Sequence, residues 1–272
     1  MGESAATRGG DAGKIVYVYG IVPGDGPAAM FDGVSGIDAS EPVVLVHAAG
    51  LAAVASRVPA DEFGADAIES RLHDPRWLEQ KARAHEAVLE SALGKTTVLP
   101  FRFGTLYADE AHVRDMLAGH PEFAETLSQL EGKVELGVKG FLDRDAFRKH
   151  LDAQSGGAAD APKSGRAYMQ RKQLERELDE AARAFAVECA EISHQQLTVA
   201  AEAGRMNAAQ PFAVTQPNQE MLLNGAYLVR SDDEQRFADA LAALRERYAA
   251  EGVTYKLTGP WPPYNFVGES DE

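Results

Sequence analysis

The stretch that decides how this chain closes its fold reads KLTGPWPPYNFV and spans residues 256–267. Its three prolines hold the backbone extended, because each proline fixes its own φ and moves the preceding residue out of the helical region. A polyproline-like segment needs no internal hydrogen bonds, so it can lie across a sheet as a strap. Trp261, Tyr264 and Phe266 would anchor this strap, since each aromatic side chain can bury roughly 150–250 Å².

The strap aromatics leave two interpretations open. In the first, Trp261, Tyr264 and Phe266 only close a C-terminal domain. In the second, part of their surface stays open and receives a partner, because aromatic residues are favoured at the centres of interfaces. Arg102 is the fourth candidate partner-binding residue. We expect it in a strand between two phenylalanines, where it either makes a structural ion pair or binds a partner's carboxylate.

The segment before the strap has the element order of a ferredoxin-like domain. Strands are predicted at 133–141, 206–215, 221–230 and 253–257, with helices at 143–151, 166–203 and 233–250. If the two helices at 143–151 and 166–203 are taken as one helical connection, the order from Lys133 onward is strand, helix, strand, strand, helix, strand, the split βαβ arrangement. In the first of these strands Val134, Leu136 and Val138 share one face, while Lys133, Glu135 and Lys139 share the other, as expected of a half-buried strand.

The N-terminal half predicts a second α+β domain. Strands are expected at 15–22, 43–47, 51–58 and 97–103, the middle two joined by Ala48-Ala49-Gly50 as a hairpin. Asp74 is a good N-cap, and Pro75 suits the first position of the following helix. Asp109 and Pro121 would open two shorter helices.

The domain organisation follows from these elements. We expect a disordered tail at 1–13, an N-terminal α+β domain at 14–132, a C-terminal ferredoxin-like domain at 133–267 and an acidic tail at 268–272. Residues 154–165, rich in Ser, Gly, Ala and Pro, are expected to form a flexible insert in the second domain. The fold class is therefore α+β with two domains and one long helix.

The composition and net charge limit the classes of partner that this chain can bind. The 272 residues carry a net charge of −15, which argues against nucleic acid and anionic lipid, since both attract basic proteins. Cys189 is the only cysteine, so an internal disulfide is excluded. The first residues lack the apolar core of a signal peptide, and the sequence contains no apolar run long enough to span a bilayer. We expect a soluble cytoplasmic protein that does not insert into membranes.

The sequence offers no positive case for catalysis. Residues 24–29, GDGPAA, resemble a dinucleotide-binding loop, but turn residues follow them instead of a helix, so we interpret them as a tight turn. His85 lies on the apolar stripe of its helix without a second histidine at zinc spacing, which favours a hydrogen-bonded core histidine. Cys189 lies on a buried stripe and is expected to be inert. We expect no cofactor and no metal.

Several segments together resemble the gas vesicle protein F/L family. The C-terminal TGPWPPYNFV looks like the signature of that family, and further segments fit it in the same order. These segments are YVYGIV at 17–22, HEAVL at 85–89, VLPFRFGT at 98–105, VELGVK at 134–139 and LNGAYL at 223–228. The resemblance covers residues 14 to 267.

This resemblance implies a role in building the gas-filled protein shell, and it implies the same C-terminal fold. It implies an accessory protein, associated with the gas vesicle, that binds the major shell subunit, limits its aggregation and helps nucleate the shell. Other gas vesicle accessory proteins are implied as further partners. Two alternatives stay open, namely a minor structural component of the shell and, less favoured, an enzyme that uses a nucleotide.

Overall fold

The structure is a computed structural model of the chain that describes residues 13–26, 28–154, 165–208 and 219–267. It divides into two compact units, one made of Met1–Gly132 with Pro262–Glu272 and the other of Lys133–Trp261. Both contain an antiparallel sheet with helices, so the α+β class is confirmed. Residues 262–267, which we expected in the C-terminal domain, group with the first unit instead. The predicted tails and insert lie, apart from Gly13, Gln154 and Gly165, outside the described residues.

The sheet of the first unit contains five strands in the part of the chain described. They are β1 (Lys14–Pro23), β2 (Val44–Ala48), β3 (Leu51–Pro59), β4 (Leu99–Pro100) and β5 (Leu106–Tyr107). The order is β2-β3-β1-β4, with β5 also paired to β1. The predicted hairpin is confirmed, because β2 and β3 are joined by Ala49 and Gly50 with φ values of 51° and 77°. Gly50 takes this left-handed conformation without the steric cost of a Cβ.

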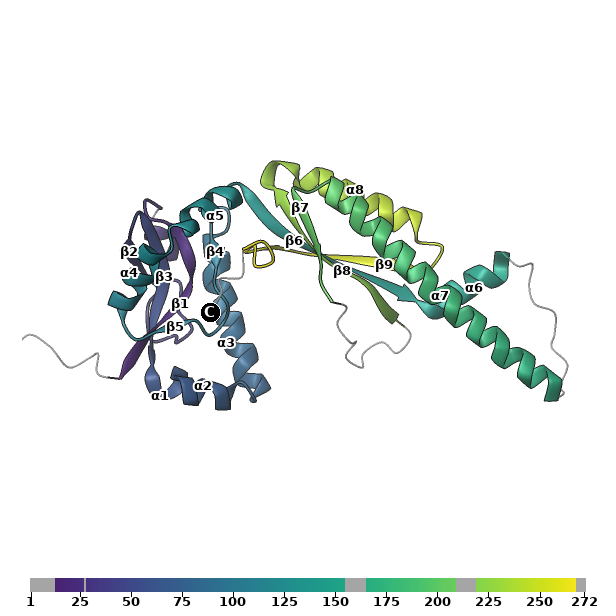
Figure 1. Ribbon diagram of the computed structural model, residues 1–272, viewed down its shortest axis with the longest axis horizontal. Helices are drawn as coiled ribbons and strands as arrows, with labels where there is room; N and C mark the ends of the chain where they lie inside the picture. The colour runs from purple at the N-terminus through teal and green to yellow at the C-terminus, as the bar shows by residue number, and fades with distance from the viewer. Residues whose placement is uncertain (1–12, 27, 155–164, 209–218, 268–272) are drawn as a thin grey trace, which may run out of the picture. The chain divides into compact units, whose positions relative to one another are not determined.

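Helices cover both faces of this sheet (Figure 1). On one face, α3 (Pro75–Ala92) packs against Tyr17 and Tyr19 of β1. On the other face, α4 (Glu110–Gly119) and α5 (Glu122–Leu130) pack against Val16 and Val18. Because both faces of β1 are buried, its sequence is an almost unbroken apolar run. The remaining helical segments are η1 (Ala28–Phe31), α1 (Ala60–Phe63) and α2 (Ala65–Arg71).

The caps predicted for this unit are confirmed. The side chain of Asp74 accepts hydrogen bonds from the backbone N–H groups of Arg76 at 3.0 Å and Trp77 at 3.4 Å, with Pro75 at the first helical position. The side chain of Asp109 accepts one from the N–H of His112 at 3.0 Å. These bonds satisfy donors that a helix N-terminus otherwise leaves unpaired.

The second unit is built on a four-stranded antiparallel sheet with the order β7-β8-β6-β9. Its strands are β6 (Lys133–Asp143), β7 (Ala203–Met206), β8 (Gln219–Arg230) and β9 (Val253–Trp261). Its helical segments are α6 (Arg144–Gln154), α7 (Gly165–Val199), η2 (Ser231–Asp233) and α8 (Glu234–Arg247). The finer assignment of this unit as ferredoxin-like stays a prediction.

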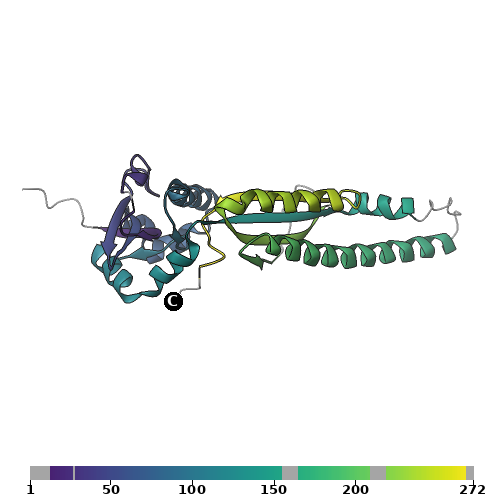
Figure 2. The same ribbon diagram turned by 90° about the horizontal axis from the view of Figure 1, so that it is seen from above.

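Both α7 and α8 cover the same face of this sheet, as Figures 1 and 2 show. The buried core between them and the strands comprises Leu136, Val138, Leu142, Leu197, Leu223, Tyr227, Val229, Phe237, Leu241, Leu244, Val253 and Tyr255. Leu136 and Val138 thus face the helices, as their alternation predicts. By the same alternation Lys133, Glu135 and Lys139 lie on the opposite face.

Three predicted strands differ in extent from those observed. The strand expected at 97–103 is observed only at Leu99–Pro100, although the N–H of Phe101 still bonds to the carbonyl of Tyr19 at 2.8 Å. Arg102 follows the strand instead of lying in it. The strand expected at 206–215 is observed at Ala203–Met206, while 209–215 lie outside the described residues. The last strand continues to Trp261, so the first part of the strap is a strand.

The continuation of β9 has a physical reason. Trp261 is paired with Glu135 and Thr258 with Gly137, with a shift in register between the two pairs. This bulge takes up Gly259 and Pro260, and a proline is tolerated there because β9 is an edge strand.

Candidate partner-binding surfaces

Tyr264, in the part of the strap that belongs to the first unit, is held by two neighbouring residues of α3. Its hydroxyl lies 3.0 Å from Nε2 of His85 and donates to Oε1 of Glu86 at 3.0 Å. On the far side of the imidazole, Nδ1 of His85 lies 2.9 Å from the hydroxyl of Tyr17, which in turn accepts from the backbone N–H of Gly104 at 3.0 Å. Tyr264 therefore links Glu86 to a hydrogen-bonded chain that starts at Tyr17 in the sheet.

The directions of these hydrogen bonds are consistent with a neutral imidazole. Burial lowers the pKa of His85 to about 4, so one ring nitrogen donates and the other accepts near neutral pH. The hydroxyl of Tyr264 donates to Glu86, so it accepts from Nε2–H of His85, and Nδ1 accepts from Tyr17. The pKa of Glu86 is raised by burial, while the bond from Tyr264 opposes that rise.

The rest of the C-terminal segment also packs within the first unit. Pro262 and Pro263 are buried, Tyr264 packs against the core on the α3 side, and Val267 packs against the core on the α4 side. Phe266 is half-buried, and its N–H bonds to the carbonyl of Pro263 at 3.0 Å. Tyr264 is therefore a structural anchor, but of the N-terminal unit and not of the C-terminal domain.

The other candidates do not gather into one site. Trp261 is the last residue of β9 in the second unit, and 36% of it is exposed. Arg102 is an exposed residue of the first unit, and its carbonyl accepts from the N–H and hydroxyl of Thr105. Their roles in partner binding stay predictions.

An apolar groove of about 620 Å³ lies in the second unit between α7 and the strands β7 and β8. Val187 is 60% exposed on its helix wall, and Met206 is 52% exposed on its strand wall. The other apolar lining residues are Ala186, Ala190, Ala208, Met221 and Leu222, while Arg183, Glu191 and Glu220 supply charges. Large apolar side chains exposed together are typical of a surface that another chain covers.

Sequence reasoning missed this groove because it followed only the buried stripe of the long helix. Val187 lies off that stripe, which includes the buried residue Cys189. The signal in the sequence that could have indicated the groove was Val187, a valine on an otherwise polar helix face. Its neighbours Met206 and Leu222 are brought to it only by the fold, so the sequence alone does not reveal the groove.

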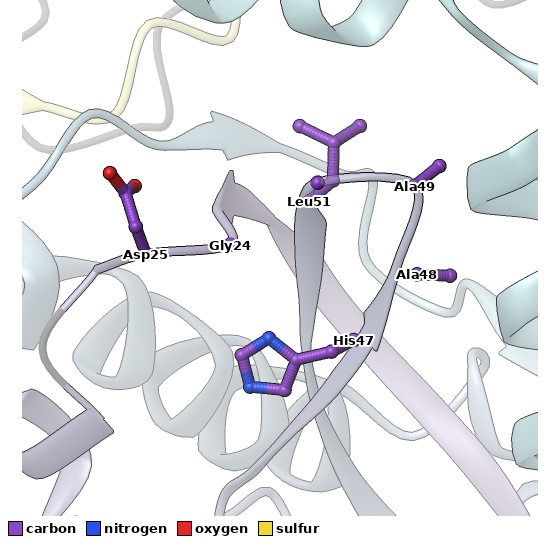
Figure 3. Close-up of a pocket in the computed structure, with 7 residues that line it drawn as sticks. Gly24, Asp25, His47, Ala48, Ala49 and Leu51 are labelled. Atoms are coloured by element: carbon purple, nitrogen blue, oxygen red, sulfur yellow. The ribbon is translucent and has the colours of Figure 1, made fainter.

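Gly24 and Asp25, at the start of the GDGPAA segment, line a shallow hollow at the end of the hairpin (Figure 3). The N–H of Gly24 bonds to the carbonyl of Gly50 at 2.9 Å, and the N–H of Gly26 bonds to the carbonyl of Pro23 at 3.1 Å. Asp25 and His47 line the hollow but point in different directions (Figure 3). Residues 24–26 therefore form the predicted tight turn, and the four-residue η1 begins at Ala28 in place of an α-helix.

Tyr255, Ser193 and Cys189 form a cluster of polar groups in the core of the second unit. The hydroxyl of Tyr255 lies 2.7 Å from Oγ of Ser193 and 3.4 Å from Sγ of Cys189. Burial raises the pKa of the Cys189 thiol, which disfavours the reactive thiolate. Within the described ranges, His, Cys, Asp and Glu form no group that could hold a metal ion. The helices of those same ranges include none that is both long and apolar enough to cross a membrane.

The sequence and the fold of this chain were compared with those of known proteins. Residues 15–268 match the family described as gas vesicle synthesis protein GvpL/GvpF. The chain is 34% identical over 261 residues to gas vesicle protein L of Streptomyces sp. (strain CB03234), covering 95% of each. Its fold is similar to the crystal structure of the gas vesicle protein GvpF from Anabaena sp. PCC7120, with a TM-score of 0.68, 21% identity and coverage of 95% of this chain and 98% of the other. The GvpF structure from Microcystis aeruginosa gives a TM-score of 0.61 at 21% identity, with coverage of 93% and 98%.

Proposed function

Because this chain belongs to the gas vesicle GvpL/GvpF family, we propose that it is an assembly accessory protein that binds the small apolar shell subunit through the groove between α7 and the β7–β8 edge. In this role it limits aggregation of the subunit and delivers it to the growing shell. It acts in the cytoplasm, associated with the vesicle, and without catalysis. Its other partners are further gas vesicle accessory proteins.

The exposure of Val187 and Met206 on facing walls of the groove is the observation that carries this proposal. Covering such side chains removes apolar surface from water, worth roughly 25 cal/mol per Å² before the costs of association are subtracted. A partner with an apolar segment therefore gains affinity at the groove. The net charge of −15 opposes self-association of the complex, which suits a carrier of an aggregation-prone client.

Co-purification with the shell subunit tests the proposal, using two matched valines of α7. Val187→Glu places a charge in the groove, whereas Val199→Glu places the same charge on the same helix at a residue that does not line the groove. Val187 is 60% exposed and Val199 is 77% exposed, so both substitutions leave the core intact. We expect Val187→Glu to weaken retention of the shell subunit by at least about tenfold, and Val199→Glu to retain it.

Two controls make the result decisive. Both variants should show the wild-type thermal transition by circular dichroism, so that lost binding cannot be attributed to unfolding. Equal retention of the shell subunit by both variants would reject the groove as its binding site.

Retention of this chain on vesicles stripped of peripheral proteins would instead favour a structural component of the shell over a carrier.

A further inference from the structure

The sheet of the second unit has a basic face on the side opposite α7 and α8. Along each strand, residues that face the helices alternate with residues that face away from them. Most charged residues of the strands belong to the set that faces away from the helices. That set includes the cations Lys133, Lys139, Arg205, Arg230 and Lys256 and the carboxylates Glu135 and Asp143. This concentration of positive charge stands out in a chain whose net charge is −15.

Like charges lie directly opposite one another at two positions on this face. Lys139 of β6 is the cross-strand partner of Lys256 of β9, and Lys133 of β6 is the partner of Arg230 of β8. Directly opposed like charges destabilise an antiparallel sheet. These pairs therefore do not owe their presence to stabilisation of the fold.

Internal contacts neutralise this face only in part. Lys133 forms an ion pair with Glu202 at 3.7 Å, and Nζ of Lys256 lies 5.4 Å from the ring centroid of Phe141. Among the described residues, Lys139, Lys256 and Arg230 have no carboxylate within ion-pair distance. Positive charge on the face is thus available to a partner.

Trp261 supplies the apolar part of the same face. It is the cross-strand partner of Glu135, so its ring lies on the side of the sheet that carries the cations, and it is 36% exposed. An aromatic residue among cations resembles the composition of protein interfaces, in which Trp and Arg are enriched.

We propose that this basic face, comprising Lys133, Lys139, Arg205, Arg230, Lys256 and Trp261, docks a segment of a partner protein rich in Asp and Glu. The two like-charge pairs are six residues apart along β6, or about 20 Å at the rise of a strand, which suits a short acidic segment. Such a segment would relieve the repulsion within both pairs when it binds. This surface is distinct from the apolar groove, so it provides the chain with a second partner site.

Charge favours a short acidic segment over nucleic acid or an anionic membrane. Those polyanions extend well beyond the basic face and would meet the field of a chain with net charge −15. A short segment interacts mainly with the face itself, because charges beyond about 8 Å are screened at physiological salt.

Fluorescence anisotropy with a labelled oligoglutamate peptide tests this proposal on the full chain. The test variant is Lys139→Gln with Lys256→Gln. The matched control is Lys149→Gln with Lys172→Gln, which removes the same charge from exposed lysines of α6 and α7. We expect the test variant to bind the peptide at least about tenfold more weakly than wild type, and the control to bind within about twofold.

Thermal unfolding provides an independent readout. Removing the opposed charges of Lys139 and Lys256 should leave the melting temperature unchanged or raise it, because a repulsion is lost. A melting temperature below that of wild type would show that these cations stabilise the fold, and it would overturn the proposal. Equal peptide binding by the test and control variants would overturn it as well.

A different ligand of the basic face would give a different result in binding assays. Tighter binding of a single-stranded DNA oligonucleotide than of a peptide with equal charge would reassign the face to nucleic acid. Binding to phosphatidylserine vesicles but not to the peptide would reassign it to a membrane surface. Self-association of the wild type that the test variant abolishes, measured by sedimentation, would reassign it to a second copy. Each of these three results overturns the proposal.

Discussion

At the scale of single residues, the hydroxyl of Tyr264 makes hydrogen bonds with two polar side chains of α3. The hydroxyl accepts from His85 and donates to Glu86, and both partners are adjacent residues of α3. The other carboxylate oxygen of Glu86 is buried and has no hydrogen-bond partner among the described residues. Removing the hydroxyl of Tyr264 would therefore leave this carboxylate without the bond that compensates its desolvation.

We accordingly predict that Tyr264→Phe destabilises the first unit by about 1–3 kcal/mol, the usual cost of leaving a buried polar group unpaired. The two tryptophans make this measurable, since Trp77 lies in the first unit and Trp261 in the second. In a Trp261→Phe background, Trp77 fluorescence follows urea unfolding of the first unit alone. Tyr107→Phe is the control, because no hydrogen bond to its hydroxyl is found among the described residues. An equal effect of both substitutions would contradict the role of the Tyr264 hydroxyl.

The buried imidazole of His85 predicts acid sensitivity of the same unit. Its pKa falls from 6.5 to about 4 because burial disfavours the charged form. Above pH 6.5 both the folded and unfolded states are neutral at this residue, so it has no effect there. As the pH falls from 6.5 to about 4, only the unfolded state binds the proton, and stability is lost by up to about 3 kcal/mol.

His85→Gln removes this titration and tests its sign. The variant should lose less stability than wild type between pH 6.5 and pH 4, whatever its stability at pH 7. Glu86 acts in the opposite sense, because its raised pKa costs stability as the pH rises, but it is present in both proteins. The difference between the two slopes therefore isolates His85. Parallel stability curves for wild type and variant would show that the imidazole is not held neutral.

At the scale of the elements, α7 is one continuous helix with two environments. Its residues from 172 to 180 are exposed or half-buried, including Leu174 at 44% exposure. From Ala182 onward the helix is anchored in the core by Ala182, Ala186, Cys189 and Leu197. Most of the stability of a helix in a protein comes from such packing.

Hydrogen exchange should therefore show a gradient along α7. We predict that amides at 172–180 exchange by local fraying, whereas those at 186–197 exchange only with unfolding of the whole unit. α8 serves as the control, because Phe237, Leu241 and Leu244 anchor it along its length and should keep it protected throughout. Uniform protection along α7 would indicate that its first part is packed by something other than the core.

The elements also show what the sequence could predict. Alternation in β6 predicted both faces of that strand, and the Asp74-Pro75 pair predicted the start of α3, because these signals act over a few residues. The sequence could not predict that the strap is divided between the two units after Trp261. Tyr264 and Glu86 are 178 positions apart, and only the fold brings them together. The groove at Val187 was missed for the same reason, because its opposite wall comes from β7 and β8.

At the scale of the whole molecule, the chain starts in the first unit, forms the second and then returns to the first. The return is made by Pro262–Glu272, of which Tyr264 contacts the core on one face of the sheet and Val267 the core on the other. The first unit is therefore complete only when the last residues of the chain are in place. The second unit consists of the continuous range Lys133–Trp261.

This arrangement predicts the result of truncating the chain after Trp261. Loss of the buried Pro262 and Pro263 and of Tyr264 should destabilise the first unit by on the order of 3 kcal/mol or more, from lost packing and unpaired polar groups. The second unit should keep its stability, because it loses none of its own residues. Hydrogen exchange read separately in α3 and α8 distinguishes the two units. A chain truncated after Val267 is the control and should match the full chain in both helices. Faster exchange in α8 with α3 unchanged would instead place residues 262–267 with the second unit, as the sequence first suggested.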